Sequence, residues 1–121
     1  MEGNMEREFV YLSSFDLKSK KKQVFNNQFQ RELEYFILGH LKHPSVAPVI
    51  SGTNGIRKIR FAPSFEKRGK SGSYRIFFVD FPKTGKTILL TLLDKHESEN
   101  LTKEERNILA EQVKILRNYY N

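Results

Sequence analysis

The chain has 121 residues and a net charge of +7 at pH 7, a length that suits one compact domain and is too short for two full cores. It contains no cysteine, which excludes disulfides, thiolate zinc sites and a cysteine nucleophile. The first residues lack a signal-peptide pattern, and apolar runs such as Ile88 to Leu93 are far shorter than a membrane span. We therefore expect one domain over residues 1–121, located in the cytoplasm and without membrane contact.

The first half of the chain predicts a short strand and an amphipathic helix. Phe9 to Leu12 favours a strand, and Asp16 to Lys22 favours a solvated helix face or a loop. Apolar residues then recur at every fourth position, as on one face of a helix, at Phe25, Phe29, Leu33, Ile37 and Leu41. Pro44 and Pro48 are expected to end this helix, and Ser51 to Gly55 predicts a turn.

The second half predicts three strands and a closing helix. Arg57 to Ala62 and Tyr74 to Phe81 favour strands, and Thr87 to Leu93 is apolar on both faces, as in a central strand. Thr102 begins a helix with a capping box that Glu105 completes. The buried stripe of this helix is predicted to contain Ile108, Leu109, Val113, Leu116 and Tyr120. The element order predicts an α+β fold: a small, largely antiparallel four-stranded sheet with N-terminal helices and a C-terminal helix.

Positive charge is concentrated between Gly52 and Arg75. This segment holds seven Lys and Arg residues against a single acid, Glu66, and so carries six of the seven net positive charges. A concentrated positive field attracts polyanions and raises their encounter rate. A basic face that merely keeps the protein soluble is the alternative. We interpret the segment as a nucleic-acid-binding surface.

Strand alternation divides the residues of this basic segment between two faces. Ile59 and Phe61 are expected to face the core, while Lys58 and Arg60 project from the opposite face. Arg75 comes from the next strand, and the Gly- and Ser-rich loop before it allows a phosphate to approach the backbone closely. The residues that we predict to contact RNA are Arg57, Lys67, Arg68, Lys70, Ser71 and Gly72.

Other motifs favour neither a nucleotide site nor a metal site. The Gly-Lys-hydroxyl tripeptides at 69–71 and 85–87 lack the upstream glycine of a phosphate loop and lie between predicted strands. His40 and His43 have no third ligand placed to join them, so we expect no metal and no cofactor. The cluster from Asp94 to Glu97 follows the central strand and is either part of a site or a surface group of ion pairs.

Three segments resemble, in their order and spacing, the RelE/HigB superfamily of bacterial toxins: Gly52 to Arg60, Gly69 to Ile76, and Lys95 to Glu97 with the following Leu101 and Thr102. The resemblance implies a RelE-like fold and a toxin that enters the ribosomal A site and cuts mRNA there without a metal. It also implies a small antitoxin protein as partner, with operator DNA bound only through the toxin–antitoxin complex. An aromatic residue of some members corresponds to Tyr119 or Tyr120.

The resemblance also assigns catalytic roles by position. Lys58 and Arg60 match the basic pair that faces the scissile phosphate, and Arg75 matches an arginine that stabilises charge on it. Lys95 and His96 lie in the last site segment of the family. Some relatives have Arg at the place of His96, so the resemblance does not identify which residue is the general acid.

Cleavage without a metal requires the RNA 2′-hydroxyl to attack the adjacent phosphate, with a base, an acid and cations to assist. We expect Arg60 and Arg75 to stabilise the phosphate and Lys58 and His96 to share proton transfer. Alanine at Arg75 is expected to abolish toxicity and to leave folding intact. Two alternatives stay open: a related toxin that poisons DNA gyrase, and a nucleic-acid-binding module without catalysis.

Overall fold

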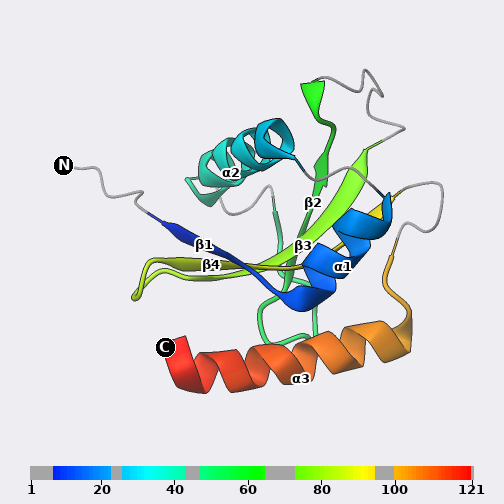
Figure 1. The fold of residues 1–121 in the computed structure, drawn as a ribbon. Helices are drawn as coiled ribbons and strands as arrows, with labels where there is room; N and C mark the ends of the chain where they lie inside the picture. Colours follow the sequence, from blue (N-terminus) through cyan, green and yellow to red (C-terminus); the bar gives the residue numbers. More distant parts are fainter. Residues whose placement is uncertain (1–6, 23–25, 43–46, 65–72, 95–99, 121) are drawn as a thin grey trace.

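A computed structural model describes residues 7–22, 26–42, 47–64, 73–94 and 100–120. Its elements are, in chain order, β1 (Glu8–Tyr11), α1 (Ser13–Lys22), α2 (Asn27–Leu41), β2 (Arg57–Phe61), β3 (Tyr74–Phe81), β4 (Lys86–Asp94) and α3 (Lys103–Tyr120) (Figure 1). This order and the single four-stranded sheet confirm the predicted α+β fold. Among the described helices, none is both long and apolar enough to cross a membrane.

The sheet has the strand order β1-β4-β3-β2. The two inner pairings, β4 with β3 and β3 with β2, are antiparallel, whereas β1 runs parallel to β4. The residues from Thr87 to Leu93 are all buried, because β4 has a neighbour on both sides and helices over both faces. The prediction of a central strand here is confirmed.

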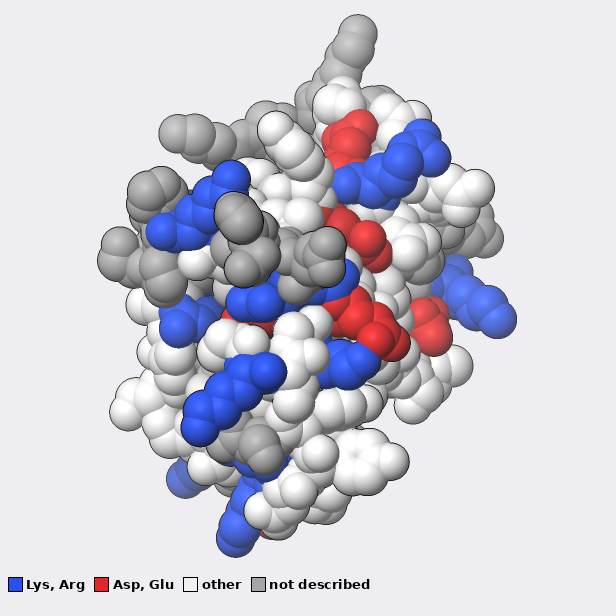
Figure 2. All heavy atoms as spheres, turned by 90° about the vertical axis from the view of Figure 1, so that its left-hand side faces the viewer, with Lys and Arg blue, Asp and Glu red and all other residues white. Residues whose placement is uncertain are grey.

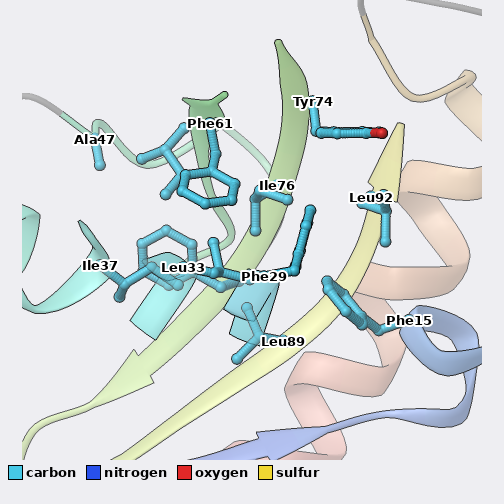
Figure 3. Close-up of a cluster of buried hydrophobic side chains, with 12 residues drawn as sticks. Phe15, Phe29, Leu33, Ile37, Ala47, Phe61, Tyr74, Ile76, Leu89 and Leu92 are labelled. Carbon is cyan, nitrogen blue, oxygen red and sulfur yellow. The ribbon is translucent and has the colours of Figure 1, made fainter. Parts of the chain in front are cut away.

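Helix α2 covers one face of the sheet (Figures 1 and 3). Its N-cap, Asn26, accepts a hydrogen bond from the Phe29 backbone N–H at 2.9 Å, which satisfies one of the open donors of the first turn. Phe29, Leu33 and Ile37 are fully buried at the predicted spacing. They pack with Phe61 and other apolar residues of the sheet. Phe25, the first residue of the predicted stripe, lies outside the described residues.

Helix α3 covers the opposite face of the sheet (Figure 1). Its capping box is confirmed: the Glu105 backbone N–H donates to Thr102 Oγ1 at 3.0 Å, and the Thr102 N–H donates to Glu105 Oε1 at 2.9 Å. The helix buries Leu109, Ala110 and Val113. Ile108 is 53% exposed, so its prediction as a buried residue was wrong.

Candidate nucleic-acid interface

The pairing of β2 with β3 sets Arg60 directly opposite Arg75. Opposed residues of an antiparallel pair share a face, with Cα atoms about 4.5–5.5 Å apart. Lys58 lies two residues before Arg60 and so projects from the same face, about 7 Å along the strand. We call Lys58, Arg60 and Arg75 the cationic cluster. The register therefore brings together three of the predicted catalytic residues.

The three cations of this cluster differ in their access to solvent. Arg60 is exposed and Lys58 is half-buried, whereas Arg75 is only 1% exposed. The Arg75 Nη1 donates a hydrogen bond to the Ser73 carbonyl at 2.9 Å, as a buried guanidinium requires. A phosphate can therefore meet Arg60 directly but reaches Arg75 only if neighbouring groups move. Such burial also argues against the expectation that alanine at Arg75 leaves folding intact.

Asn100 joins the cluster to the chain that follows β4. The Lys58 Nζ donates a hydrogen bond to Asn100 Oδ1 at 2.9 Å, although the two residues are 42 positions apart. Asn100 lies three residues after the predicted site segment Lys95 to Glu97, and this contact places Asn100 beside β2. Nothing in the local sequence pattern of Asn100 identified it as part of a site.

Several predicted site residues lie outside the described residues. They are the predicted catalytic residues Lys95 and His96 and the predicted RNA contacts Lys67, Arg68, Lys70, Ser71 and Gly72. Their roles stay predictions. The site as described therefore consists of the cationic cluster and Asn100.

Arg57 is the one predicted RNA contact that the structure describes, and it lies away from the cluster. Its register partner is Phe78, and the alternation of β2 places it with Ile59 on the face that α2 covers. Its Nη1 donates to the carbonyl of buried Ala47 at 2.6 Å. This geometry supports a structural role for Arg57 and does not bring it together with Lys58 and Arg60.

The C-terminal tyrosines are also distant from the cationic cluster. The Tyr120 ring centroid lies 5.7 Å from that of Phe81, the last residue of β3. Six residues of extended strand separate Phe81 from Arg75, a span of about 20 Å. Tyr119 packs on Tyr120 and is 80% exposed. The structure thus brings neither tyrosine to the site.

Several charges at the other end of the sheet are paired with an opposite charge. Figure 2 views the molecule from the side of the β3–β4 turn, where Lys and Arg are interspersed with Asp and Glu. Near this turn Arg7 pairs with Asp80 at 3.1 Å, and Lys86 pairs with Glu8. Opposite charges in contact cancel much of each other's electric field. We therefore expect this end of the sheet to attract polyanions less strongly than the cationic cluster does.

The remaining motifs have local roles. His40 Nδ1 lies 2.9 Å from the Phe36 carbonyl, one turn back in α2. The described residues contain no group of three His, Cys, Asp or Glu side chains that could hold a metal ion. Gly85 adopts a φ of +67° in the β3–β4 turn. The residues after it form strand β4, as we predicted for the tripeptide at 85–87, whereas a phosphate loop would begin a helix there.

No model of a known protein family matches the chain. The chemistry of the site is therefore the main guide to function. Exposed Arg60 and half-buried Lys58 offer donors to a phosphate on one face of the sheet. Buried Arg75 adds a positive charge beside them.

Proposed function

We propose that this chain is the toxin of a type II toxin–antitoxin system, a metal-independent endoribonuclease of the RelE/HigB kind that cleaves mRNA on the ribosome and so inhibits translation. The observation that carries the proposal is the cross-strand pair of Arg60 and Arg75, with Lys58 on the same face. Like charges directly opposite one another in a sheet are unfavourable. A phosphate that contacts exposed Arg60 is attracted by the positive charge of the whole cluster. The resemblance of the surrounding segments to the superfamily adds support.

The proposed reaction is an intramolecular transfer at phosphorus. The 2′-oxygen of one nucleotide forms a bond to the adjacent phosphorus, and the bond from phosphorus to the 5′-oxygen of the next nucleotide breaks. A base takes the proton of the 2′-hydroxyl, and an acid gives a proton to the leaving oxygen. The products are a 2′,3′-cyclic phosphate and a 5′-hydroxyl.

Each member of the cationic cluster suits a different part of this reaction. Exposed Arg60 makes the first contact with the phosphate. Arg75 is buried beside Arg60 and does not itself contact the phosphate, but its positive charge opposes the negative charge that develops on phosphorus, because water screens a buried charge less. Lys58 shares proton transfer with His96, and Lys95 assists from the same segment.

Binding partners follow from the same proposal. Basic residues of the segment before β3, Lys67, Arg68 and Lys70, hold neighbouring phosphates of the mRNA, and the backbone of Ser71 and Gly72 adds N–H donors. The protein partner is a cognate antitoxin. Operator DNA is bound only through the complex with that antitoxin.

The test is to add the purified protein to a reconstituted translation reaction that contains one defined mRNA and to map the 5′ ends produced. We expect 5′-hydroxyl ends in phase with the codons. Arg60→Ala should lower the cleavage rate by about 100-fold, the typical loss of one charge-stabilising donor. Arg31→Ala is the matched control, because Arg31 is an exposed arginine on α2, and it should cleave at the wild-type rate.

Two results would overturn the proposal in favour of its alternatives. Intact mRNA together with accumulation of gyrase-linked DNA breaks would assign the chain to the gyrase-poisoning toxins. RNA binding that weakens steeply with salt, without any strand scission on translating ribosomes, would assign it to the non-catalytic modules.

A further inference from the structure

Asn54 and Gly55 form the only Asn-Gly pair of the chain. They lie in the turn at residues 51–55 that precedes β2, and this turn rests against α3 (Figure 1). Asn54 has a φ of +64° and Gly55 a φ of +113°. Asparagine is a thermolabile residue, and a following glycine makes it more so, because glycine has no Cβ to keep its backbone nitrogen away from the carboxamide.

The reaction open to such a pair is an intramolecular deamidation. The Gly55 backbone nitrogen forms a bond to Cγ of Asn54, the bond from Cγ to Nδ2 breaks, and ammonia leaves with the proton of the Gly55 nitrogen. The product is a five-membered succinimide ring. Water then adds to one of the two ring carbonyl carbons, which opens the ring to aspartate or to isoaspartate. Water is the only co-reactant, and Asn54 is exposed to it.

Helix α3 holds both reacting groups of the pair in place. Asn54 Nδ2 donates to the Ala110 carbonyl at 2.9 Å, which directs the carboxamide toward the helix. Arg117 Nε donates to the Asn54 carbonyl at 2.8 Å, and its guanidinium lies so close to Gly55 that an added Cβ would clash with Nη2. Ring closure turns the carboxamide back over its own backbone and so breaks the bond to Ala110. The reaction therefore requires α3 to release the turn.

Release of α3 is a local event in this fold. Of the residues of the helix, only Leu109, Ala110 and Val113 are buried. Elements that bury few apolar groups open at a lower free energy than the whole domain unfolds. Helix α2 and the sheet share a separate core on the opposite face, which includes Leu33 and Phe61. That core can keep its packing while α3 opens.

We propose that Asn54 is a deamidation site that docked α3 keeps closed and that opens when the helix is released. The product weakens the docking in turn, because aspartate at position 54 has no donor for the Ala110 carbonyl and places a carboxylate beside that acceptor. The change is permanent, because the ammonia that leaves is not replaced. The inference stands on this turn alone and goes beyond the proposed function.

The test follows the mass of one peptide of the full chain over time. Trypsin releases residues 43–57 as a peptide in which Asn54 is the only side-chain amide, so a gain of one mass unit reports on this residue. We expect the protein unfolded in urea to deamidate at least about tenfold faster than the folded protein in the same buffer. Equal rates in the two states would overturn the proposal. Isoaspartate should appear beside aspartate, and aspartate alone would mean direct hydrolysis without the ring.

A pair of variants separates release of α3 from unfolding of the whole domain. Leu109→Ala truncates a buried side chain of α3, and Leu33→Ala makes the same change on α2. In native buffer Leu109→Ala should deamidate about tenfold faster than wild type, whereas Leu33→Ala should stay within about twofold of it. Equal increases in the two variants would show that the site opens only by global unfolding, which contradicts the role of α3.

The wild-type protein gives the same decision if either variant fails to fold. Its deamidation rate is measured in urea concentrations below the unfolding transition. Release of one helix exposes little surface, so the rate should rise with urea much less steeply than the unfolding equilibrium does. A urea dependence as steep as that of global unfolding would rule out the local release of α3.

Asn54→Asp reproduces the product and tests its effect on docking. We expect the equilibrium constant for unfolding to rise about tenfold, because a donor is lost and two acceptors meet. Asn107→Asp adds the same charge at an exposed position of α3 and should leave the constant nearly unchanged. Wild-type stability in Asn54→Asp would refute the claim that the modification weakens docking. None of these measurements involves mRNA, so this inference and the proposed nuclease activity can fail separately.

Discussion

The Lys58 ammonium is held by the Asn100 side chain, whose Oδ1 accepts its hydrogen bond at 2.9 Å. This bond fixes one member of the cationic cluster against the chain that follows β4. In the proposed nuclease, Asn100 is therefore a positioning residue that acts through Lys58.

Asn100→Ala should lower kcat for mRNA cleavage by about tenfold and leave KM nearly unchanged, because the charge of Lys58 remains while its orientation is lost. Asn100→Asp keeps an acceptor and should restore most of the rate. Asn100 is exposed, so the free energy of unfolding should change by less than about 0.5 kcal/mol. A wild-type kcat in Asn100→Ala would contradict this role.

Arg75→Ala should destabilise the fold as well as abolish cleavage. Arg75 is among the largest fully buried side chains, and its removal leaves a cavity and frees the Ser73 carbonyl. We expect the free energy of unfolding in urea to fall by about 3 kcal/mol. Arg75→Met fills more of the space, so it should cost less stability and still lose activity. An unfolding free energy equal to wild type in Arg75→Ala would contradict this account of its burial.

Gly55→Ala should loosen the attachment of α3. Gly55 has a φ of +113°, and an added Cβ would clash with Arg117 Nη2. Arg117 Nε donates to the Asn54 carbonyl at 2.8 Å, a bond that this clash displaces. We expect a loss of about 2 kcal/mol in chemical denaturation. Gly39→Ala, on α2 with open space around it, should instead stabilise the protein by about 0.5–1 kcal/mol.

Tyr11 should make stability fall at alkaline pH. Burial, together with a 2.6 Å hydrogen bond from its hydroxyl to Glu34 Oε2, raises the pKa of Tyr11 well above its usual range. The unfolded chain loses this proton near pH 10, while the folded protein keeps it. The free energy of unfolding should therefore fall as the pH rises above about 10. Tyr11→Phe should show a shallower fall between pH 9 and 11 in urea titrations, and identical slopes would contradict the assignment.

Those parts of the fold that depend on local pattern could be predicted from the sequence. Ile59 and Phe61 are buried as alternation requires, and Leu33 and Ile37 are buried as a helical period requires. The same alternation along β2 puts Arg57 on the face of Ile59 and not on the face of Lys58, so it could have shown that Arg57 does not join the predicted site. Each of these features depends only on residues a few positions apart.

Features that depend on distant parts of the chain could not be predicted. A count of charges does not distinguish Arg60 from Arg75. In the structure Arg60 is exposed and Arg75 is buried, because burial depends on the residues from distant parts of the chain that pack around each. Ile108 fits the apolar stripe of α3 but borders an open hollow beside α1. The bond from Lys58 to Asn100 likewise requires the assembled sheet.

The parallel pairing of β1 with β4 also determines when the fold can be completed. Glu8 is in register with Lys86, 78 residues later. Such distant contacts form slowly, because the intervening chain must first be ordered. During synthesis, β1 must therefore wait without its partner until β4 has left the ribosome. A nascent chain that lacks β4 has no complete sheet and so cannot yet present the folded cationic cluster.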